Sequence, residues 1–81
     1  MRTIVVLERD YTVADEDMRD RYIGGSPCRS FDGARELVFA HHHSGCNWSI
    51  SYMNNGMLYA EISQETGELV AEYFVQLVTD C

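Results

Sequence analysis

Hydrophobic positions in the first third of the chain follow two different periods. Residues 3–8 are apolar or β-branched on both parities up to the final Glu, which predicts a strand buried on both faces. Apolar side chains then recur at every fourth position, at Ala14, Met18 and Tyr22. This spacing predicts one apolar stripe of a helix over residues 13–23, and the two glycines that follow are typical of a helix end.

A second helix is predicted over residues 31–43. The segment 24–30 before it is rich in Gly, Ser and Pro, so we interpret it as a loop whose Ser30 caps the helix. The side chains that share the core-facing side of this helix are Phe31, Ala34, Leu37, Val38 and His41. A Ser-Gly pair directly after the helix ends it.

The rest of the chain alternates between apolar and polar positions, which predicts a β-meander. Its three strands are expected over residues 48–53, 57–62 and 68–78. The sequence Asn-Asn-Gly at residues 54–56 predicts a hairpin, because Asn-Gly tolerates the positive φ angles that a type I′ turn requires. Residues 64–67 form the second turn.

The element order β-α-α-β-β-β predicts a single α+β domain over residues 1–81. We expect both helices on one face of a four-stranded, mainly antiparallel sheet with a C-terminal β-meander. The first and last strands are the most apolar, so they are expected side by side in the interior, which leaves the strand of Trp48 at an edge. Because an open edge can pair with a second copy, a homodimer is one expectation.

Strand parity also predicts which face of the meander stays open. One parity carries Trp48 and the more apolar residues of the two later strands, so we expect it to face the helices. The opposite parity places apolar side chains among carboxylates, at Met53, Tyr59, Glu61, Val70, Glu72 and Phe74. Aromatic side chains ringed by polar groups are typical of interface centres, so this face is predicted to bind a partner.

The chain is strongly acidic, with a net charge of −7, and the charge is unevenly distributed. All six Arg lie in residues 1–35, whereas residues 36–81 contain six acidic residues and no Lys or Arg. An acidic chain is repelled by phosphate backbones, so direct nucleic-acid binding is not expected. The anionic second part suits a basic protein surface instead.

The first predicted helix offers a second candidate surface. Glu16 and Asp20 are four residues apart on it, where like charges repel. Such a face is either an ordinary solvated surface or one that awaits Lys or Arg from a partner. The candidate partner-binding residues of both surfaces are Glu16, Asp20, Tyr59, Glu61, Glu68, Glu72 and Phe74.

The residue types that most often carry catalysis or bind metal show no recognisable arrangement. Three consecutive histidines, residues 41–43, lie on the second predicted helix, where neighbouring side chains diverge and cannot converge on one ion. Three cysteines without a CxxC spacing suit reduced thiols. Cys46 has no nucleophile elbow, oxyanion loop or orienting residue around it. We therefore expect no enzymatic activity, no metal site and no cofactor.

The apolar runs of the chain are short. None approaches the ~20 residues of a membrane helix, and the apolar stretch after Arg2 is too short for a signal peptide. The sequence therefore predicts a cytoplasmic protein without a membrane partner.

Over its whole length, the chain resembles the small phage-encoded inhibitors of bacterial defence, and the anti-CRISPR proteins of type I systems in particular. The resemblance lies in length, acidic charge, helix-plus-meander order and cytosolic cysteines. It implies a non-enzymatic inhibitor in the host cytoplasm that docks its carboxylates on Lys and Arg of an RNA-guided surveillance complex and blocks target DNA binding. The group has no diagnostic motif, so no residue role is carried over.

Three alternatives stay open. An antitoxin-like partner would use the same acidic surface to neutralise a basic toxin. A metal- or redox-responsive module would use His42, His43 and Cys46. A homodimeric ligand-binding domain would need a pocket at the dimer interface, because so short a chain encloses little space.

Overall fold

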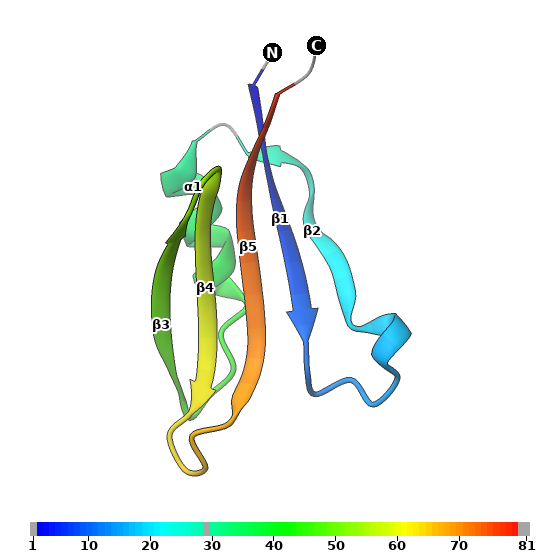
Figure 1. Ribbon diagram of the computed structural model, residues 1–81, viewed down its shortest axis with the longest axis vertical. Helices are drawn as coiled ribbons and strands as arrows, with labels where there is room; N and C mark the ends of the chain where they lie inside the picture. The colour runs from blue at the N-terminus through cyan, green and yellow to red at the C-terminus, as the bar shows by residue number, and fades with distance from the viewer. Residues whose placement is uncertain (1, 29, 80–81) are drawn as a thin grey trace.

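One antiparallel sheet with an α-helix against it forms the structure (Figure 1). The structure is a computed structural model that describes residues 2–28 and 30–79. The elements in chain order are β1 (Arg2–Asp10), η1 (Glu16–Met18), β2 (Asp20–Cys28), α1 (Phe31–Ala40), β3 (Cys46–Met53), β4 (Gly56–Ser63) and β5 (Leu69–Thr79). The predicted α+β class and the antiparallel sheet are confirmed. Within the described residues the sheet has five strands rather than four, and there is one α-helix rather than two.

The strand order is β2-β1-β5-β4-β3. The first and last strands of the chain are neighbours in the interior of the sheet, and β1 pairs with β5 over its whole length. The strand of Trp48 is β3, which lies at one edge and pairs with β4. Both placements confirm the expectation drawn from hydrophobicity.

The predicted helix over residues 13–23 is wrong. Residues Glu16–Met18 form a single 3-10 turn, and from Asp20 the chain continues as β2, antiparallel to β1. Met18 and Tyr22 from the predicted apolar stripe are exposed, so the stripe contributes little burial. The strand is favoured because β1 is apolar on both faces and its second edge needs backbone hydrogen-bond partners, which β2 supplies.

The helix α1 begins as predicted and ends earlier. The Ser30 hydroxyl accepts a hydrogen bond from the Gly33 backbone N–H at 3.1 Å, which confirms the predicted cap. The loop before it is shorter than predicted, because β2 continues to Cys28. The helix ends at Ala40 rather than at residue 43, and His41 is its C-terminal cap.

The β3–β4 hairpin lies where predicted, but its turn differs. Asn54 and Asn55 form a two-residue loop, and no non-glycine residue in the described ranges has a positive φ angle, so the turn is not type I′. Gly56 belongs to β4, where a Cβ atom would lie only 1.8 Å from the Val75 carbonyl oxygen. Glycine is needed here for the close approach of β5, not for a left-handed backbone.

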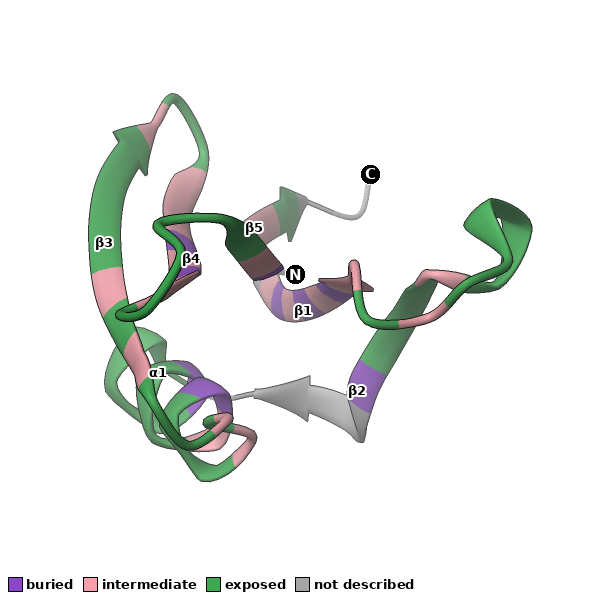
Figure 2. Ribbon diagram, turned by 90° about the horizontal axis from the view of Figure 1, so that it is seen from below, coloured by how far each residue is buried: buried purple, intermediate pink, exposed green. Residues whose placement is uncertain are grey.

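The sheet curves around α1, which lies on its concave side (Figure 2). The side chains buried between them are Ile4, Val6, Ile23, Ala34, Val38, Tyr59, Ala71, Tyr73 and Val75. None of the helices in the described residues is long and apolar enough to cross a membrane.

The predicted parity is confirmed for the core of β5 and is wrong for β4. Tyr59 and Glu61 face α1, because the hairpin pairs them with Ile50 and Trp48, and directly paired residues share a face. Val70 was also expected on the open face. It packs against the core instead, beside a shift in register between β4 and β5.

Candidate functional site

The face of the sheet that points away from α1 is the main candidate site, and we call it the open face. A row of apolar side chains crosses four strands of it, and we call Tyr22, Leu7, Phe74 and Leu58 the apolar row. Leu7 pairs with both Tyr22 and Phe74, and Phe74 pairs with Leu58. Tyr22 is 70% exposed, whereas the other three are half-buried by their neighbours in the sheet.

A charged row, formed by Asp20, Arg9 and Glu72, lies beside the apolar row on the same face. Arg9 pairs with both carboxylate residues in the strand register. Its guanidinium donates to Asp20 at 2.8 and 3.0 Å and lies over the Phe74 ring, 5.4 Å from the centroid. The Glu72 carboxylate accepts a hydrogen bond from the Tyr11 hydroxyl at 2.5 Å. The open face thus combines an apolar centre with a fixed arrangement of charges.

The hydrogen bonds of the charged row set its ionisation. The Arg9 guanidinium holds the pKa of Asp20 below its ordinary value, so this carboxylate is ionised at neutral pH. The hydrogen bond to Glu72 raises the pKa of Tyr11, so this hydroxyl keeps its proton. With two carboxylates and one guanidinium, the charged row is anionic.

The predicted partner-binding residues divide between the two faces of the sheet. Glu72 and Phe74 lie on the open face as parity predicts, and Asp20 joins them through β2 rather than through a helix. Tyr59 is 2% exposed and Glu61 is completely buried, both on the opposite face. The prediction that these two line the open face is wrong, and neither offers a contact surface.

The remaining two candidates lie in loops at one end of the sheet. Glu16 is exposed in η1, and Glu68 is exposed in the turn between β4 and β5 (Figure 1). Glu16 and Asp20 do not share a helical face, because the helix that would align them is absent. Arg19 approaches Glu16 instead, at 4.0 Å.

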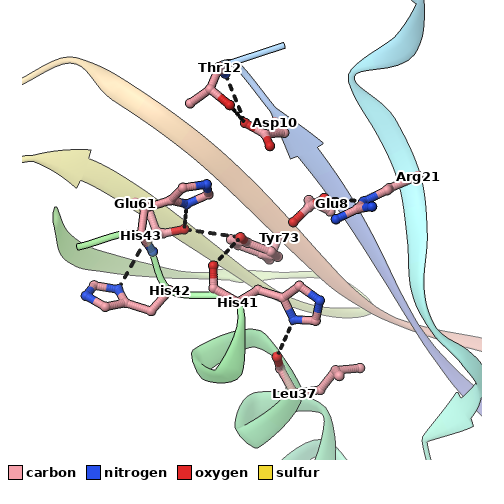
Figure 3. A network of polar contacts seen from close by, with 10 residues as sticks. All are labelled: Glu8, Asp10, Thr12, Arg21, Leu37, His41, His42, His43, Glu61 and Tyr73. Atoms are coloured by element: carbon pink, nitrogen blue, oxygen red, sulfur yellow. Dashed lines mark hydrogen bonds and ion pairs between the residues drawn. The ribbon is translucent and has the colours of Figure 1, made fainter. Parts of the chain in front are cut away.

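A buried polar cluster on the α1 side of the sheet was not predicted (Figure 3). Its centre is the completely buried carboxylate of Glu61. The backbone N–H of His43 donates to Glu61 at 2.7 Å, and the His43 Nδ1 lies 2.9 Å from it. The His42 Nδ1 lies 3.2 Å away, and the Tyr73 hydroxyl donates at 3.1 Å. Glu61 thereby attaches the segment after α1 to the sheet.

A second buried carboxylate lies on the other side of Tyr73. Glu8 is 2% exposed and accepts a hydrogen bond from Arg21 Nε at 2.5 Å. Burial, together with the negative charges of Glu61 and Glu8, raises the pKa of Tyr73 well above its ordinary value. The Tyr73 hydroxyl is therefore protonated and serves as a donor.

The cluster also changes the interpretation of the three histidines. His43 is half-buried, and its hydrogen bond to Glu61 raises its pKa above the ordinary 6.5. His41 was expected on the core-facing side of the helix, and its ring lies 2.9 Å from the Leu37 carbonyl oxygen at the helix end. Among the described residues, no three potential metal ligands come together in a geometry that could hold an ion.

Cys46 and His43 border a hollow of ≈ 400 Å³. Burial raises the pKa of the Cys46 thiol, so it is protonated at neutral pH. A protonated thiol is a poor nucleophile.

The raised pKa of His43 predicts a pH-dependent stability. A group with a raised pKa stabilises the fold fully below its unfolded pKa, and this contribution is lost as pH rises through the folded pKa. We therefore expect the free energy of unfolding of the wild type to fall as pH rises above 6.5. In His43→Asn, an amide N–H can replace the Nδ1 donor without titrating, so this decline should be smaller. Urea unfolding over a pH series measures both, and identical pH profiles would contradict the prediction.

Comparison with protein-family models, with curated proteins and with solved structures gives no match.

Proposed function

We propose that this protein is a non-enzymatic inhibitor that binds a basic nucleic-acid-binding assembly through its open face. The assembly we propose is a type I CRISPR surveillance complex, whose binding to target DNA would be blocked. The observation that carries the proposal is the apolar row, which no element of the described chain covers and which lies beside the carboxylates Asp20 and Glu72. An apolar centre with charged groups at its margin is the usual anatomy of a protein interface.

The apolar row supplies the contact that salt does not screen. Tyr22 and Phe74 are aromatic, and buried aromatic side chains are the most frequent anchors of protein interfaces. Phe74 is held by the Arg9 guanidinium above its ring, so it loses little freedom on binding. The row spans four neighbouring strands and is therefore a rigid platform.

The acidic charge supplies attraction at long range. The chain has a net charge of −7, and exposed carboxylates in η1 and in the β4–β5 turn lie at one end of the sheet. A surface that holds DNA is rich in Lys and Arg, so an acidic protein competes with DNA for it. This attraction mainly accelerates association, and it weakens as salt rises.

Two substitutions on the open face test this proposal. Phe74→Ala is expected to weaken binding to a purified surveillance complex by about 30-fold, the size of an interface anchor. Glu72→Arg is expected to weaken binding by about tenfold at low salt and less at high salt. Biolayer interferometry measures the affinity, and a DNA-binding assay measures whether the wild-type protein releases the target.

Glu36→Arg is the matched control, because this exposed residue lies on α1, away from the open face, and the charge change is the same. Its affinity should change by much less than that of Glu72→Arg. Equal losses would show that only net charge matters, and unchanged binding of folded Phe74→Ala would exclude the open face. Capture of a small basic toxin in place of the surveillance complex would favour the antitoxin-like alternative.

A further inference from the structure

The two edge strands of the sheet differ in how they resist pairing with another chain. The sequence of β2 contains charged residues and a proline, and its pairing with β1 has an irregular register. These features discourage the addition of another strand. In contrast, β3 pairs with β4 in an unbroken register over Cys46–Met53 and contains neither proline nor a charged residue. The unprotected edge of the sheet is therefore β3.

The distribution of charged residues indicates which kind of partner can pair with the edge strand β3. Every other strand or helix in the described chain contains at least one Asp, Glu or Arg, whereas the eight residues of β3 contain none. Two copies of a chain with a charge of −7 repel each other over most of their surface. At β3 they can approach without bringing carboxylates together. A basic partner, in turn, would gain no ion pair from this strand.

The exposed apolar side chains of β3 also favour pairing with a partner, because their burial is stabilising. Tyr52 is 85% exposed and Ile50 is 49% exposed, although both lie on the face of the sheet that α1 covers elsewhere. Trp48 lies on the same face, and its ring packs against Phe39 at 5.2 Å and Tyr73 at 5.8 Å. The helix α1 therefore covers the Trp48 end of β3 and leaves the end with Ile50 and Tyr52 exposed.

We propose that two copies of this chain pair through β3, antiparallel and about a twofold axis at Ile50, into one continuous sheet with five strands from each copy. This dimer goes beyond the inhibitor proposed above and does not depend on it. Unlike the row of side chains on the open face, β3 offers backbone groups, and a second copy of the same strand offers a matching set.

Backbone geometry supports the position of the axis. The two-residue loop closes on a hydrogen-bonded pair of Met53 and Gly56, and hydrogen-bonded pairs then alternate along the hairpin. The N–H and C=O groups of Trp48, Ile50 and Tyr52 therefore point away from β4, towards a neighbouring strand. An axis at Ile50 places it opposite its own copy.

The same axis pairs the aromatic side chains. Trp48 lies opposite Tyr52 of the partner subunit, so two aromatic cross-strand pairs flank the central isoleucines. On the other face, Ser49 and Ser51 lie opposite each other across the axis. Because β3 contains no charged residue, none of its cross-strand pairs places like charges opposite each other. Because the axis is perpendicular to the sheet, both open faces point in the same direction.

The two edge tyrosines provide a matched test. Sedimentation equilibrium over a concentration series should give the wild-type chain a mass twice the 9.3 kDa of one copy. Tyr52→Lys should raise the dimer dissociation constant about tenfold or more, because it replaces one partner of each aromatic cross-strand pair by a charged side chain. Tyr22→Lys makes the same change on β2 and should leave the dissociation constant unchanged. Ile50→Lys gives an independent second disruption.

A wild-type chain that stays monomeric at every concentration would overturn the proposal. So would a dimer that survives Tyr52→Lys and Ile50→Lys, or one that Tyr22→Lys dissociates. Circular dichroism verifies that each variant is folded, which is expected because both tyrosines are exposed.

Cysteine cross-linking tests the register. With the axis at Ile50, the double variant Ser49→Cys/Ser51→Cys brings two non-hydrogen-bonded cysteine pairs together, a spacing that a disulfide spans. Mild oxidation should then give a covalent dimer on a non-reducing gel, and neither single variant should cross-link above the wild type. A cross-link in a single variant would place the axis at that serine and overturn the proposed register.

Discussion

Replacing Glu61 by alanine is expected to destabilise the fold by about 3 kcal/mol. The carboxylate is completely buried and accepts hydrogen bonds from the His43 backbone N–H and the Tyr73 hydroxyl. Without Glu61, the His43 backbone N–H loses its acceptor in a buried site. The Tyr73 hydroxyl keeps only its longer hydrogen bond to the His41 carbonyl oxygen, at 3.3 Å. Urea unfolding measures the change in the free energy of unfolding.

Because the chain has a single tryptophan, its fluorescence reports the packing around the cluster as well as global unfolding. The ring of Trp48 lies 5.5 Å from that of His42 and 5.8 Å from that of Tyr73. Glu61→Gln retains one oxygen acceptor and should lose less stability than Glu61→Ala. Glu65→Ala, in an exposed turn, should change stability by less than about 0.5 kcal/mol. Equal stability of Glu61→Ala and the wild type would show that the cluster is not a structural element.

The elements that could be predicted are those with strong local signals. The apolar residues of β1 and β5 indicated that these two strands are neighbours in the interior of the sheet. The two strands do pair with each other. Ser30 indicated the start of α1, because a hydroxyl at that position can accept a backbone N–H, and it does. The edge position of β3 followed from its weaker hydrophobicity.

The strand β2 could not be predicted in the same way, because the evidence for it is tertiary. Residues 20–23 are Asp-Arg-Tyr-Ile, which is too short and too polar to compete with a helical spacing that begins at Ala14. What decides the conformation is the free edge of β1 and the contact of Arg21 with the buried Glu8. Local spacing carries no information on either.

The buried position of Glu61 could have been predicted from the geometry of the β3–β4 hairpin. Any two-residue hairpin loop pairs an even-numbered residue with an odd-numbered one, so Trp48 and Ile50 must share a face with Glu61 and Tyr59. The apolar character of Leu58 favours an inward position for it, but Leu58 pairs with Phe74 on the open face. Once Glu61 is placed inward, its carboxylate requires partners, and the histidines after α1 are near it.

Replacing Gly56 by alanine is expected to destabilise the fold by about 3 kcal/mol or more. The added Cβ would lie 1.8 Å from the Val75 carbonyl oxygen and 2.9 Å from its carbon, so the obstacle is backbone and cannot rotate away. The hairpin would have to move off β5, which breaks the hydrogen bond from the Leu77 N–H to the Asn55 carbonyl oxygen at 2.7 Å. Thermal unfolding measures the loss, and hydrogen exchange at the Leu77 amide measures the local opening.

Gly33→Ala is the matched control for this substitution. In α1 the added methyl group would meet the Ser30 hydroxyl at 3.5 Å, an ordinary contact, and alanine is favoured over glycine within a helix by roughly 1 kcal/mol. The same chemical change should therefore stabilise the fold in the helix and destabilise it in the hairpin. If Gly56→Ala left both stability and Leu77 exchange unchanged, the close approach of β4 and β5 at this residue would be wrong. The glycine would then have to be explained by the turn itself, as the Asn-Gly sequence first suggested.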